Sequence, residues 1–318
     1  MKAIVTGISG QDGYFMARQL LNLGYRVLGL TSDLERARAQ LAELEDSGIT
    51  LLQFNYMQPI EFREILDAFV PDVVFNFAAI ATGRGMFDAP AEISRLNADF
   101  VVMLLDTIRS SSRRGDIVFC QASSSEMFGD AQESPQTEQT PFKPKSPYGA
   151  AKLYAHNLVN IYRASYGVRC GAAILYNHES TRRTAKFVTK KIAISAVAIK
   201  RGRARVLELG SLESSRDWGY APEYVDAIYR MSLAEGNEDY IVASGRLTTV
   251  RQLCEYAFEC VGLDYREYVV SDASEIRSVE SKNLVGDASK IARDLNWCAG
   301  KSVRDIMIEM VEYEMDRQ

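Results

Sequence analysis

The stretch Thr6-Gly7-Ile8-Ser9-Gly10-Gln11-Asp12-Gly13 decides the fold of this chain. It follows the apolar run Lys2–Thr6 and precedes an amphipathic segment that starts at Tyr14. Glycines let the backbone turn tightly and approach a ligand, and the helix that follows offers free N–H groups and a positive dipole end. The order of strand, glycine turn and helix therefore predicts a dinucleotide-binding turn. The alternative is three unrelated turn glycines.

Beyond this turn, short apolar runs alternate with amphipathic segments. The predicted strands are Lys2–Thr6, Arg26–Leu30, Thr50–Phe54, Val73–Phe77, Asp116–Ala122 and Gly171–Leu175. The predicted helices are Tyr14–Leu23, Leu34–Leu44, Ile60–Phe69, Ile93–Ser110 and Tyr148–Tyr166. This alternation predicts an α/β fold, a Rossmann-type doubly wound parallel sheet with helices on both faces. Ligands of such sheets bind at the carboxyl ends of the strands.

The pattern changes after Leu175. A polar and basic segment, residues 177–189, precedes helices predicted at Lys190–Lys200, Leu247–Cys260 and Val303–Tyr313 and short strands at Val206–Leu209 and Tyr240–Ala243. We expect a smaller α/β substrate-binding domain over the open end of the sheet. The predicted division is residues 1–175 as the NAD(P)-binding Rossmann domain and 176–318 as mainly the substrate-binding domain, with 221–246 returning to the first.

Composition limits the function classes. The 318 residues carry a formal net charge of -5, with 47% hydrophobic and 25% charged side chains. A net negative charge argues against general nucleic-acid binding. No apolar run is long enough to span a bilayer and no signal-like segment opens the chain, so we expect a cytoplasmic protein without a membrane segment. Two histidines and five cysteines without metal-ligand spacing predict no metal site.

Tyr148 and Lys152 are the first candidate catalytic pair. They stand four residues apart on one predicted helix face. The lysine charge favours the tyrosinate and is expected to lower the pKa of Tyr148 toward the working pH. Ser124, at the end of a predicted strand, can share a hydrogen bond to the same substrate oxygen. The three residues predict proton transfer coupled to hydride transfer to a nicotinamide, and an exposed helix pair is the alternative.

Glu126 is the fourth candidate catalytic residue. It lies two residues after Ser124, so both side chains point to one side of an extended segment. Oxidation of a sugar at C4 makes the C5 proton acidic, and a nearby carboxylate can remove it before the C6 hydroxyl leaves. The alternative is a carboxylate at the surface or at a helix cap.

The end of the second predicted strand bears on the cofactor. NAD enzymes usually carry an acid there to bind the ribose 2′-OH, but this chain reads Leu30-Thr31-Ser32-Asp33. Thr31 and Ser32 could bind a 2′-phosphate, and Arg36 or Arg38 could reach it. This favours NADP over NAD. The alternative is that Asp33 binds an NAD ribose while the arginines are solvated.

With these motifs the chain resembles the extended short-chain dehydrogenase/reductase family, and within it is similar to GDP-mannose 4,6-dehydratases. Besides the glycine turn, the matching stretches are Gln121-Ala122-Ser123-Ser124-Ser125-Glu126, Ser146-Pro147-Tyr148, Asn177-His178-Glu179-Ser180, Phe187-Val188-Thr189-Lys190-Lys191-Ile192, Arg216-Asp217-Trp218-Gly219 and Gly286-Asp287. They span nearly the whole chain. The segments at Asn177 and Arg216 are more specific than the glycine and Tyr-Lys motifs.

The resemblance implies roles for individual residues. Ser124 occupies the position where the family has a catalytic threonine. Glu126 occupies the position of the family's base, and Tyr148 and Lys152 occupy those of its redox pair. Further cofactor contacts are implied for Asn55, Tyr56, Ala78, Ala79, His178 and Arg183, and GDP-sugar contacts for Asn177, Val188, Lys191, Arg216, Arg277 and Glu280. Arginine offers a bidentate fork to a diphosphate. A homodimer, or a tetramer, is also implied.

The implied activity is a nucleotide-sugar 4,6-dehydratase. It would convert GDP-mannose or a related GDP-hexose to the 4-keto-6-deoxy sugar by internal hydride transfer through NADP. Alternatives are an NAD(P)-dependent reductase or epimerase of a nucleotide-linked sugar, and a non-catalytic nucleotide sensor. Two departures from the family leave the hexose and the oligomer open: the short link at Thr31-Ser32-Asp33, and a loop from Ile80 to Met86 without the usual polar residues.

Overall fold

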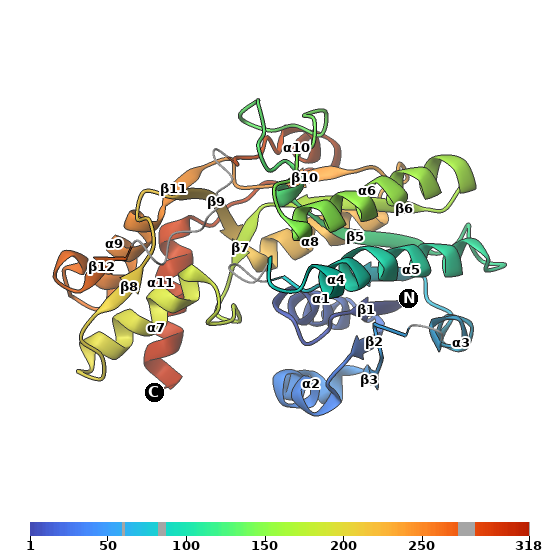
Figure 1. Ribbon diagram of the computed structural model, residues 1–318. Coiled ribbons are helices and arrows are strands. Elements are labelled where there is room, and N and C mark those ends of the chain that lie inside the picture. The colour runs from blue at the N-terminus through green and yellow to red at the C-terminus, as the bar shows by residue number, and fades with distance from the viewer. Residues whose placement is uncertain (59–60, 82–86, 273–283, 318) are drawn as a thin grey trace.

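A single parallel sheet forms the centre of the molecule. The computed structural model describes residues 1–58, 61–81, 87–272 and 284–317 (Figure 1). The sheet has seven strands in the order β10-β6-β5-β4-β1-β2-β3. Their bounds are β1 Lys2–Thr6, β2 Arg26–Thr31, β3 Ile49–Gln53, β4 Val73–Asn76, β5 Val118–Ser124, β6 Cys170–Leu175 and β10 Tyr240–Val242. The predicted Rossmann-type fold is confirmed. Chain order reverses between β1 and β4, where such sheets bind ligands.

Helices cover both faces of this sheet. One face carries α1 (Gln11–Asn22), α8 (Ala221–Leu233) and α10 (Ser289–Leu295), and the other carries α3 (Phe62–Phe69), α5 (Phe100–Arg109) and α6 (Pro147–Tyr166). Near the outer edge, α2 (Leu34–Leu41) and a 3₁₀ turn (Ala42–Ser47) lead into β3.

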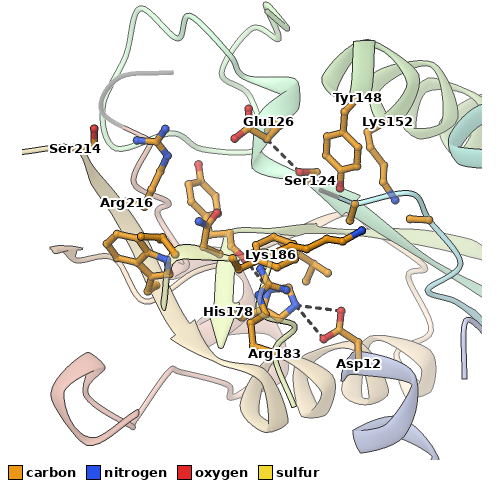
Figure 2. Close-up of a pocket in the computed structure, with 18 of the residues that line it drawn as sticks. Asp12, Ser124, Glu126, Tyr148, Lys152, His178, Arg183, Lys186, Ser214 and Arg216 are labelled. Carbon is orange, nitrogen blue, oxygen red and sulfur yellow. Dashed lines mark hydrogen bonds and ion pairs between the residues drawn. The ribbon is translucent and has the colours of Figure 1, made fainter. Parts of the chain in front are cut away.

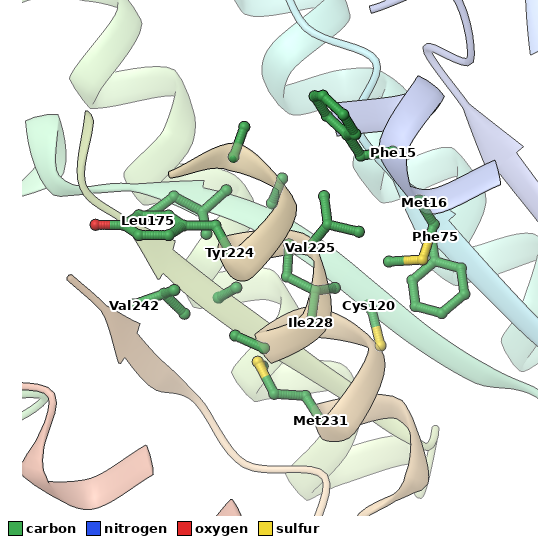
Figure 3. Packing of buried hydrophobic residues seen from close by; sticks show 14 of the residues in the cluster. Phe15, Met16, Phe75, Cys120, Leu175, Tyr224, Val225, Ile228, Met231 and Val242 are labelled. Carbon is green, nitrogen blue, oxygen red and sulfur yellow. The ribbon is translucent and has the colours of Figure 1, made fainter. Parts of the chain in front are cut away.

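Strand alternation divides the core into two clusters. Side chains of successive strand residues point to opposite faces, so Val5 packs with α1 and α8 while Ile4 packs with α5 and α6. Figure 3 shows Tyr224, Val225 and Ile228 of α8 against the sheet. Burial on both faces explains why the strands read as nearly continuous apolar runs.

A smaller region lies beside the carboxyl edge of the sheet, at the left of Figure 1. It contains a three-stranded sheet in the order β11-β9-β7 and a pair formed by β8 and β12. The strand bounds are β7 Asn177–Glu179, β8 Leu207–Leu209, β9 Ser215–Tyr220, β11 Leu247–Thr249 and β12 Val269–Ser271. Helices α7 (Val188–Lys200), α9 (Val250–Cys260) and α11 (Val303–Arg317) enclose a separate apolar cluster. We call this part the small region.

The start of the helix predicted at Leu247–Cys260 was placed too early. Residues Leu247–Thr249 pair antiparallel with β9 as β11, and the helix begins at Val250. Thr249 is the N-cap, and its side chain accepts a hydrogen bond from the Gln252 backbone in a capping box. An N-cap residue has extended backbone dihedrals, so the helix cannot start earlier.

The helix predicted at Ile93–Ser110 is interrupted. Residues Pro90–Ser94 form α4, a π-helical turn follows at Arg95–Asp99, and α5 continues from there. The Asn97 side-chain amide accepts from Ile80 N at 2.8 Å and donates to Ile80 O at 3.1 Å. The π turn thereby fixes the segment that follows β4 at the edge of the sheet.

Candidate active site

A cavity of about 450 Å³ lies at the carboxyl edge of the sheet, between β5, α6 and the small region (Figure 2). Most of the side chains expected to act on substrate or cofactor line it. These are Asp12, Ala79, Ser124, Glu126, Tyr148, Lys152, Asn177, His178, Arg183, Val188, Lys191 and Arg216. The tertiary structure therefore brings together residues from six separate stretches of sequence.

Local structure places Glu126 next to the start of α6. Ser124 ends β5, and its hydroxyl accepts from the Glu126 backbone N–H at 3.2 Å. Ser146 caps α6 by accepting from Gly149 N at 3.0 Å, with Pro147 in the first turn. A Cβ on Gly149 would lie 2.5 Å from the Glu126 carbonyl oxygen, so only glycine lets α6 pack this closely. This contact holds Tyr148 beside Glu126.

The electrostatics of Tyr148 differ from the sequence-based expectation. Burial raises the pKa of Tyr148 to about 12, although a hydrogen bond with the Ser124 hydroxyl opposes the shift. The predicted net lowering of this pKa was wrong, because desolvation of the phenolate outweighs the influences that favour its charged form. The nearby Glu126 charge adds to the increase. Tyr148 is therefore protonated at neutral pH in this arrangement.

Lys152 is buried beneath Tyr148. Its Nζ lies 5.8 Å from the centroid of the Tyr148 ring and donates to the Ala122 carbonyl at 2.8 Å. Burial lowers the pKa of Lys152 to about 8, although the Asp12 charge favours the protonated form. An amine with this pKa is charged at neutral pH and can lose its proton within the physiological range.

The glycine turn forms a cradle that fits a dinucleotide. Gly7 has φ +64°, and a Cβ there would lie 2.8 Å from Ala78 N. The N-cap of α1, Gly10, has no side chain to satisfy the first amides of the helix. Those amides and the helix dipole suit a pyrophosphate. Tyr56 supports the turn from below, since its hydroxyl accepts from Gly7 N at 2.9 Å and donates to Leu30 O at 2.5 Å.

Local hydrogen bonds fix the turn that follows β2. Thr31 is 2% exposed, and its hydroxyl bonds with the backbone of Asp33. The Asp33 carboxylate caps α2 by accepting from Arg36 N at 3.0 Å. Ser32 and the Arg36 side chain are exposed. Asn55 is also exposed, and its side chain accepts from Met57 N at 3.0 Å.

Asp12 and His178 join α1 to the small region. His178 Nε2 lies 3.0 Å from Asp12 Oδ1, and Nδ1 lies 2.7 Å from Tyr176 O. Although burial favours the neutral carboxyl, the His178 cation and its hydrogen bond lower the pKa of Asp12. Although burial also opposes the imidazolium, Asp12 raises the pKa of His178. The two groups form an ion pair across the cavity wall.

The loop between β7 and α7 carries two cations into the cavity. The Arg183 guanidinium stacks on the Phe187 ring at 3.6 Å, and Nε lies 3.1 Å from Glu179 Oε2 in an ion pair without linear hydrogen-bond geometry. Lys186 lines the cavity with an exposed side chain (Figure 2). Sequence reasoning missed Lys186. Its position two residues before the matched Val188 was the available signal.

The remaining predicted ligands come from the small region. Arg216 lies on β9 and lines the cavity, and its Nη1 donates to Ser215 O at 2.7 Å. The adjacent Asp217 is fully buried and accepts from Ser244 N and Gly245 N, so it anchors β9. Lys191 Nζ donates to Glu208 O at 2.7 Å. The predicted contacts Arg277 and Glu280, and loop residues 82–86, lie outside the described residues.

The described residues contain neither a candidate metal cluster nor a helix that could span a membrane. Within residues 1–58, 61–81, 87–272 and 284–317, no group of three His, Cys, Asp or Glu side chains is arranged to hold a metal ion. In the same ranges, no helix has the length and apolar character needed to cross a membrane.

The family model described as GDP-mannose 4,6 dehydratase matches residues 4–310. A GDP-mannose 4,6-dehydratase of Sinorhizobium fredii (strain HH103) is 35% identical over 337 residues, which cover 98% of this chain and 96% of that protein. The match therefore includes both walls of the cavity.

Solved structures share the fold at lower identity. A dTDP-glucose 4,6-dehydratase from Bacillus anthracis str. Ames, in complex with NAD, has a TM-score of 0.85 at 17% identity and covers 100% of this chain and 97% of its own. A UDP-glucose 4-epimerase from Thermotoga maritima, with UDP-glucose, has a TM-score of 0.86 at 22% identity and covers 100% and 99%. On the family match and the curated relative, the chain belongs to the GDP-mannose 4,6-dehydratase family, within the extended short-chain dehydrogenases/reductases.

Proposed function

We propose that this protein is a GDP-hexose 4,6-dehydratase, a hydro-lyase that acts on GDP-mannose or a closely related GDP-hexose. The observation that carries the proposal is the placement of a carboxylate, Glu126, in the same cavity as Tyr148, Ser124 and Lys152. A simple alcohol dehydrogenase needs the last three, whereas a dehydratase also needs a base for the C5 proton.

The proposed reaction assigns one step to each side chain. Tyr148 exchanges a proton with the C4 hydroxyl, Ser124 shares its hydrogen bond, and the Lys152 cation favours the phenolate as that proton moves. Glu126 removes the C5 proton, which the C4 carbonyl acidifies, and passes it to the departing C6 hydroxyl as water. When hydride reaches C6, the proton that Tyr148 took from the C4 hydroxyl goes to C5, so that water is the net loss. A bound nicotinamide dinucleotide would supply the hydride acceptor for C4 and the donor for C6. The residues that would hold it are Gly7, Gly10 and the first amides of α1.

We propose NADP rather than NAD as that cofactor. The Asp33 carboxylate accepts a hydrogen bond from the first turn of α2, so it already has a structural role other than binding a ribose hydroxyl. Ser32 and Arg36 are exposed at the same turn, where their side chains can bind a 2′-phosphate. Competing titrations of NADP and NAD, followed by quenching of protein fluorescence, distinguish the two. Tighter binding of NAD would contradict the preference.

The small region is proposed to hold the GDP-sugar. Lys191 and Arg216 supply positive charge along the cavity, Asn177 and Val188 line it, and diphosphates are commonly bound by such cations. Arg277 and Glu280 are proposed as further substrate contacts on the resemblance alone. A screen of GDP-, UDP-, CDP- and dTDP-sugars by calorimetry tests the guanine preference. Equal affinity for all four would contradict it.

The second candidate function is a 4-epimerase or reductase of a nucleotide-linked sugar. It is favoured by the fold shared with the UDP-glucose 4-epimerase of Thermotoga maritima. Incubation with GDP-mannose and oxidised NADP, without a reductant, separates the candidates. A dehydratase forms a 4-keto-6-deoxy product that absorbs in alkali, an epimerase forms a hexose epimer, and a reductase forms nothing.

Glu126→Gln is the decisive variant for the proposed function. It should abolish keto-sugar formation while GDP-mannose binds with nearly unchanged affinity, because the amide keeps the size of the side chain but cannot take a proton. The matched control is Glu255→Gln, an exposed carboxylate on α9 that should leave turnover unchanged. Full activity of Glu126→Gln would rule out the assigned base.

The assembly and organisation of the chain are also proposals. Exposed apolar side chains on α6, namely Tyr154 at 50%, Ile161 at 46% and Tyr166 at 47%, support a homodimer through this helix. Sizing chromatography of wild type and Ile161→Lys tests the dimer, and the same measurement detects a tetramer. The division at residue 175, with 221–246 returning to the first domain, and a cytoplasmic location remain predictions.

A further inference from the structure

A row of buried polar side chains crosses three strands beneath the cavity. Thr6 of β1 is in register with Asn76 of β4, and Asn76 is in register with Gln121 of β5. Their exposed fractions are 0%, 1% and 1%. Two residues earlier on each strand, Ile4, Val74 and Phe119 pack into the cluster on the α6 face. Because side chains alternate between faces along a strand, the polar row lies on that face too.

Every member of the row makes hydrogen bonds in one consistent direction. Ala78 N donates to Thr6 Oγ1 at 3.1 Å, and the Thr6 hydroxyl donates to Asn76 Oδ1 at 2.5 Å. Asn76 Nδ2 donates to Gln121 Oε1 at 2.8 Å. Gln121 Nε2 donates to the Ala122 carbonyl at 2.8 Å. Because a carbonyl can only accept, it fixes the orientation of Gln121, which in turn fixes that of Asn76.

The row ends at the acceptor of Lys152. Lys152 Nζ donates to the same Ala122 carbonyl at 2.8 Å, so this oxygen receives both the amine and the Gln121 amide. Lys152 is 3% exposed, and a buried amine depends strongly on each acceptor that it reaches. The other end of the row is Thr6, which precedes Gly7 and accepts from Ala78 N. Ala78 is also the residue that a Cβ on Gly7 would touch.

We propose that Gln121 and Asn76 are positioning residues for Lys152, acting through the Ala122 carbonyl. The row orients this carbonyl and shares its lone pairs, and so determines where the amine sits and how strongly its charged form is bound. Cooperative polarisation along a buried hydrogen-bond chain supports such action at a distance. The proposal rests on the proposed function only in giving Lys152 a part in proton transfer.

The charged and titratable groups around Lys152 determine how a shift in its titration is interpreted. Asp12 on α1 and Tyr148 on α6 are titratable groups beside it, whereas β1, β4 and β5 present the neutral side chains of Thr6, Asn76 and Gln121. The hydrogen bonds of Asn76 go to Thr6 and Gln121 and that of Lys152 goes to Ala122 O, so an uncharged change at Asn76 is expected to reach Lys152 through the row.

The test is an NMR titration of ¹³C-lysine-labelled full-length protein, with Lys152→Arg used to assign the Lys152 signal. In the wild type we expect a midpoint near the pKa of about 8 that burial gives Lys152. Gln121→Met removes the competing donor and should move the midpoint upward by about half a unit. Asn76→Leu removes the donor to Gln121 Oε1 without adding a charge. It weakens the Gln121 donor at the Ala122 carbonyl and should move the midpoint upward by a smaller amount, about 0.3 of a unit.

The matched control is Gln136→Met. Gln136 is also a fully buried glutamine with satisfied hydrogen bonds, but its partners are Glu133 O, Val285 N and the Tyr176 hydroxyl. It should leave the Lys152 midpoint in place. An unchanged midpoint in Gln121→Met or Asn76→Leu, or an equal shift in Gln136→Met, overturns the proposal. If Gln121→Met does not fold, Asn76→Leu decides the question, because it keeps the branched shape of the side chain and adds no charge.

Turnover provides a second readout. In both row variants kcat should fall about tenfold while KM for GDP-mannose stays within about twofold, as for other residues that orient a catalytic group. Equal losses in kcat and affinity would indicate a general structural effect and overturn the positioning role. The NMR result requires no substrate. It therefore separates failure of this proposal from failure of the dehydratase assignment, which would appear as an inactive wild type.

Discussion

The two walls of the cavity differ in how their side chains are held. On the sheet wall, Ser124 and Lys152 are 8% and 3% exposed and are fixed by strand and helix contacts. On the wall of the small region, Lys186 is exposed and Arg216 is half-buried. Tyr148 and Lys152 on the sheet wall have shifted pKa values, whereas Lys186 and Arg216 on the other wall offer charge to solvent and to ligands.

This difference separates chemistry from recognition. Proton transfer benefits from desolvated groups whose pKa values respond to single neighbours. Binding a charged nucleotide benefits from cations that attract it through solvent and pay little desolvation. Changes on the sheet wall should therefore alter turnover, and changes on the other wall should alter affinity.

After Glu126→Gln, the largest expected effect comes from Tyr148→Phe. Removal of the hydroxyl should lower kcat by about 10³-fold, because no other described side chain on the sheet wall is placed to exchange the C4 proton through Ser124. KM for GDP-mannose should change little. Steady-state measurement of keto-sugar formation checks this. A mainly KM-based loss would contradict the division between the walls.

Gly7→Ala should break the cofactor cradle. Its positive φ and the clash of a Cβ with Ala78 N predict about hundredfold weaker NADP binding. Gly24→Ala is the matched control, since Gly24 also has positive φ (+77°) but open space around a Cβ. Fluorescence titration measures both. Similar losses in the two variants would show that backbone strain alone is responsible.

The ion pair of Asp12 and His178 predicts a pH-dependent stability. The raised pKa of His178 gives a contribution that is full below its ordinary value of 6.5 and is lost as pH rises through the folded value. The lowered pKa of Asp12 gives a contribution that is full above 3.8 and is lost as pH falls through the folded value. Asp12→Asn should therefore cost about 2 kcal/mol between these limits.

Urea unfolding of wild type and Asp12→Asn at several pH values measures this difference. The gap between the two proteins should narrow above the folded pKa of His178 and below that of Asp12. A gap that does not vary with pH would mean that the pair is not ionised in the folded protein.

The smallest expected effect is that of Lys186→Gln. Loss of one exposed cation should raise KM for GDP-mannose about fivefold and weaken its salt dependence, with kcat nearly unchanged. Lys200→Gln, an exposed lysine at the other end of α7, is the control. Initial rates at two ionic strengths check the prediction. A fall in kcat alone would place Lys186 in the chemistry rather than in recognition.

Much of the sheet wall could be predicted from the sequence because its residues act through local structure. The glycine turn follows β1 directly, and Tyr148 and Lys152 are one helical turn apart. The π turn at Asn97 and the short strand β11 could not be predicted, since both depend on hydrogen bonds to distant segments, Ile80 and β9.

By itself the sequence determined the doubly wound fold, the dinucleotide turn and the four candidate catalytic residues, because strand alternation, helix spacing and turn glycines are local properties. Only the tertiary structure decided the environment of those residues. It buried Tyr148 so that its pKa rises rather than falls, it put Lys186 in the cavity, and it aligned Thr6, Asn76 and Gln121 beneath Lys152. Desolvation and strand register depend on which distant segments pack together.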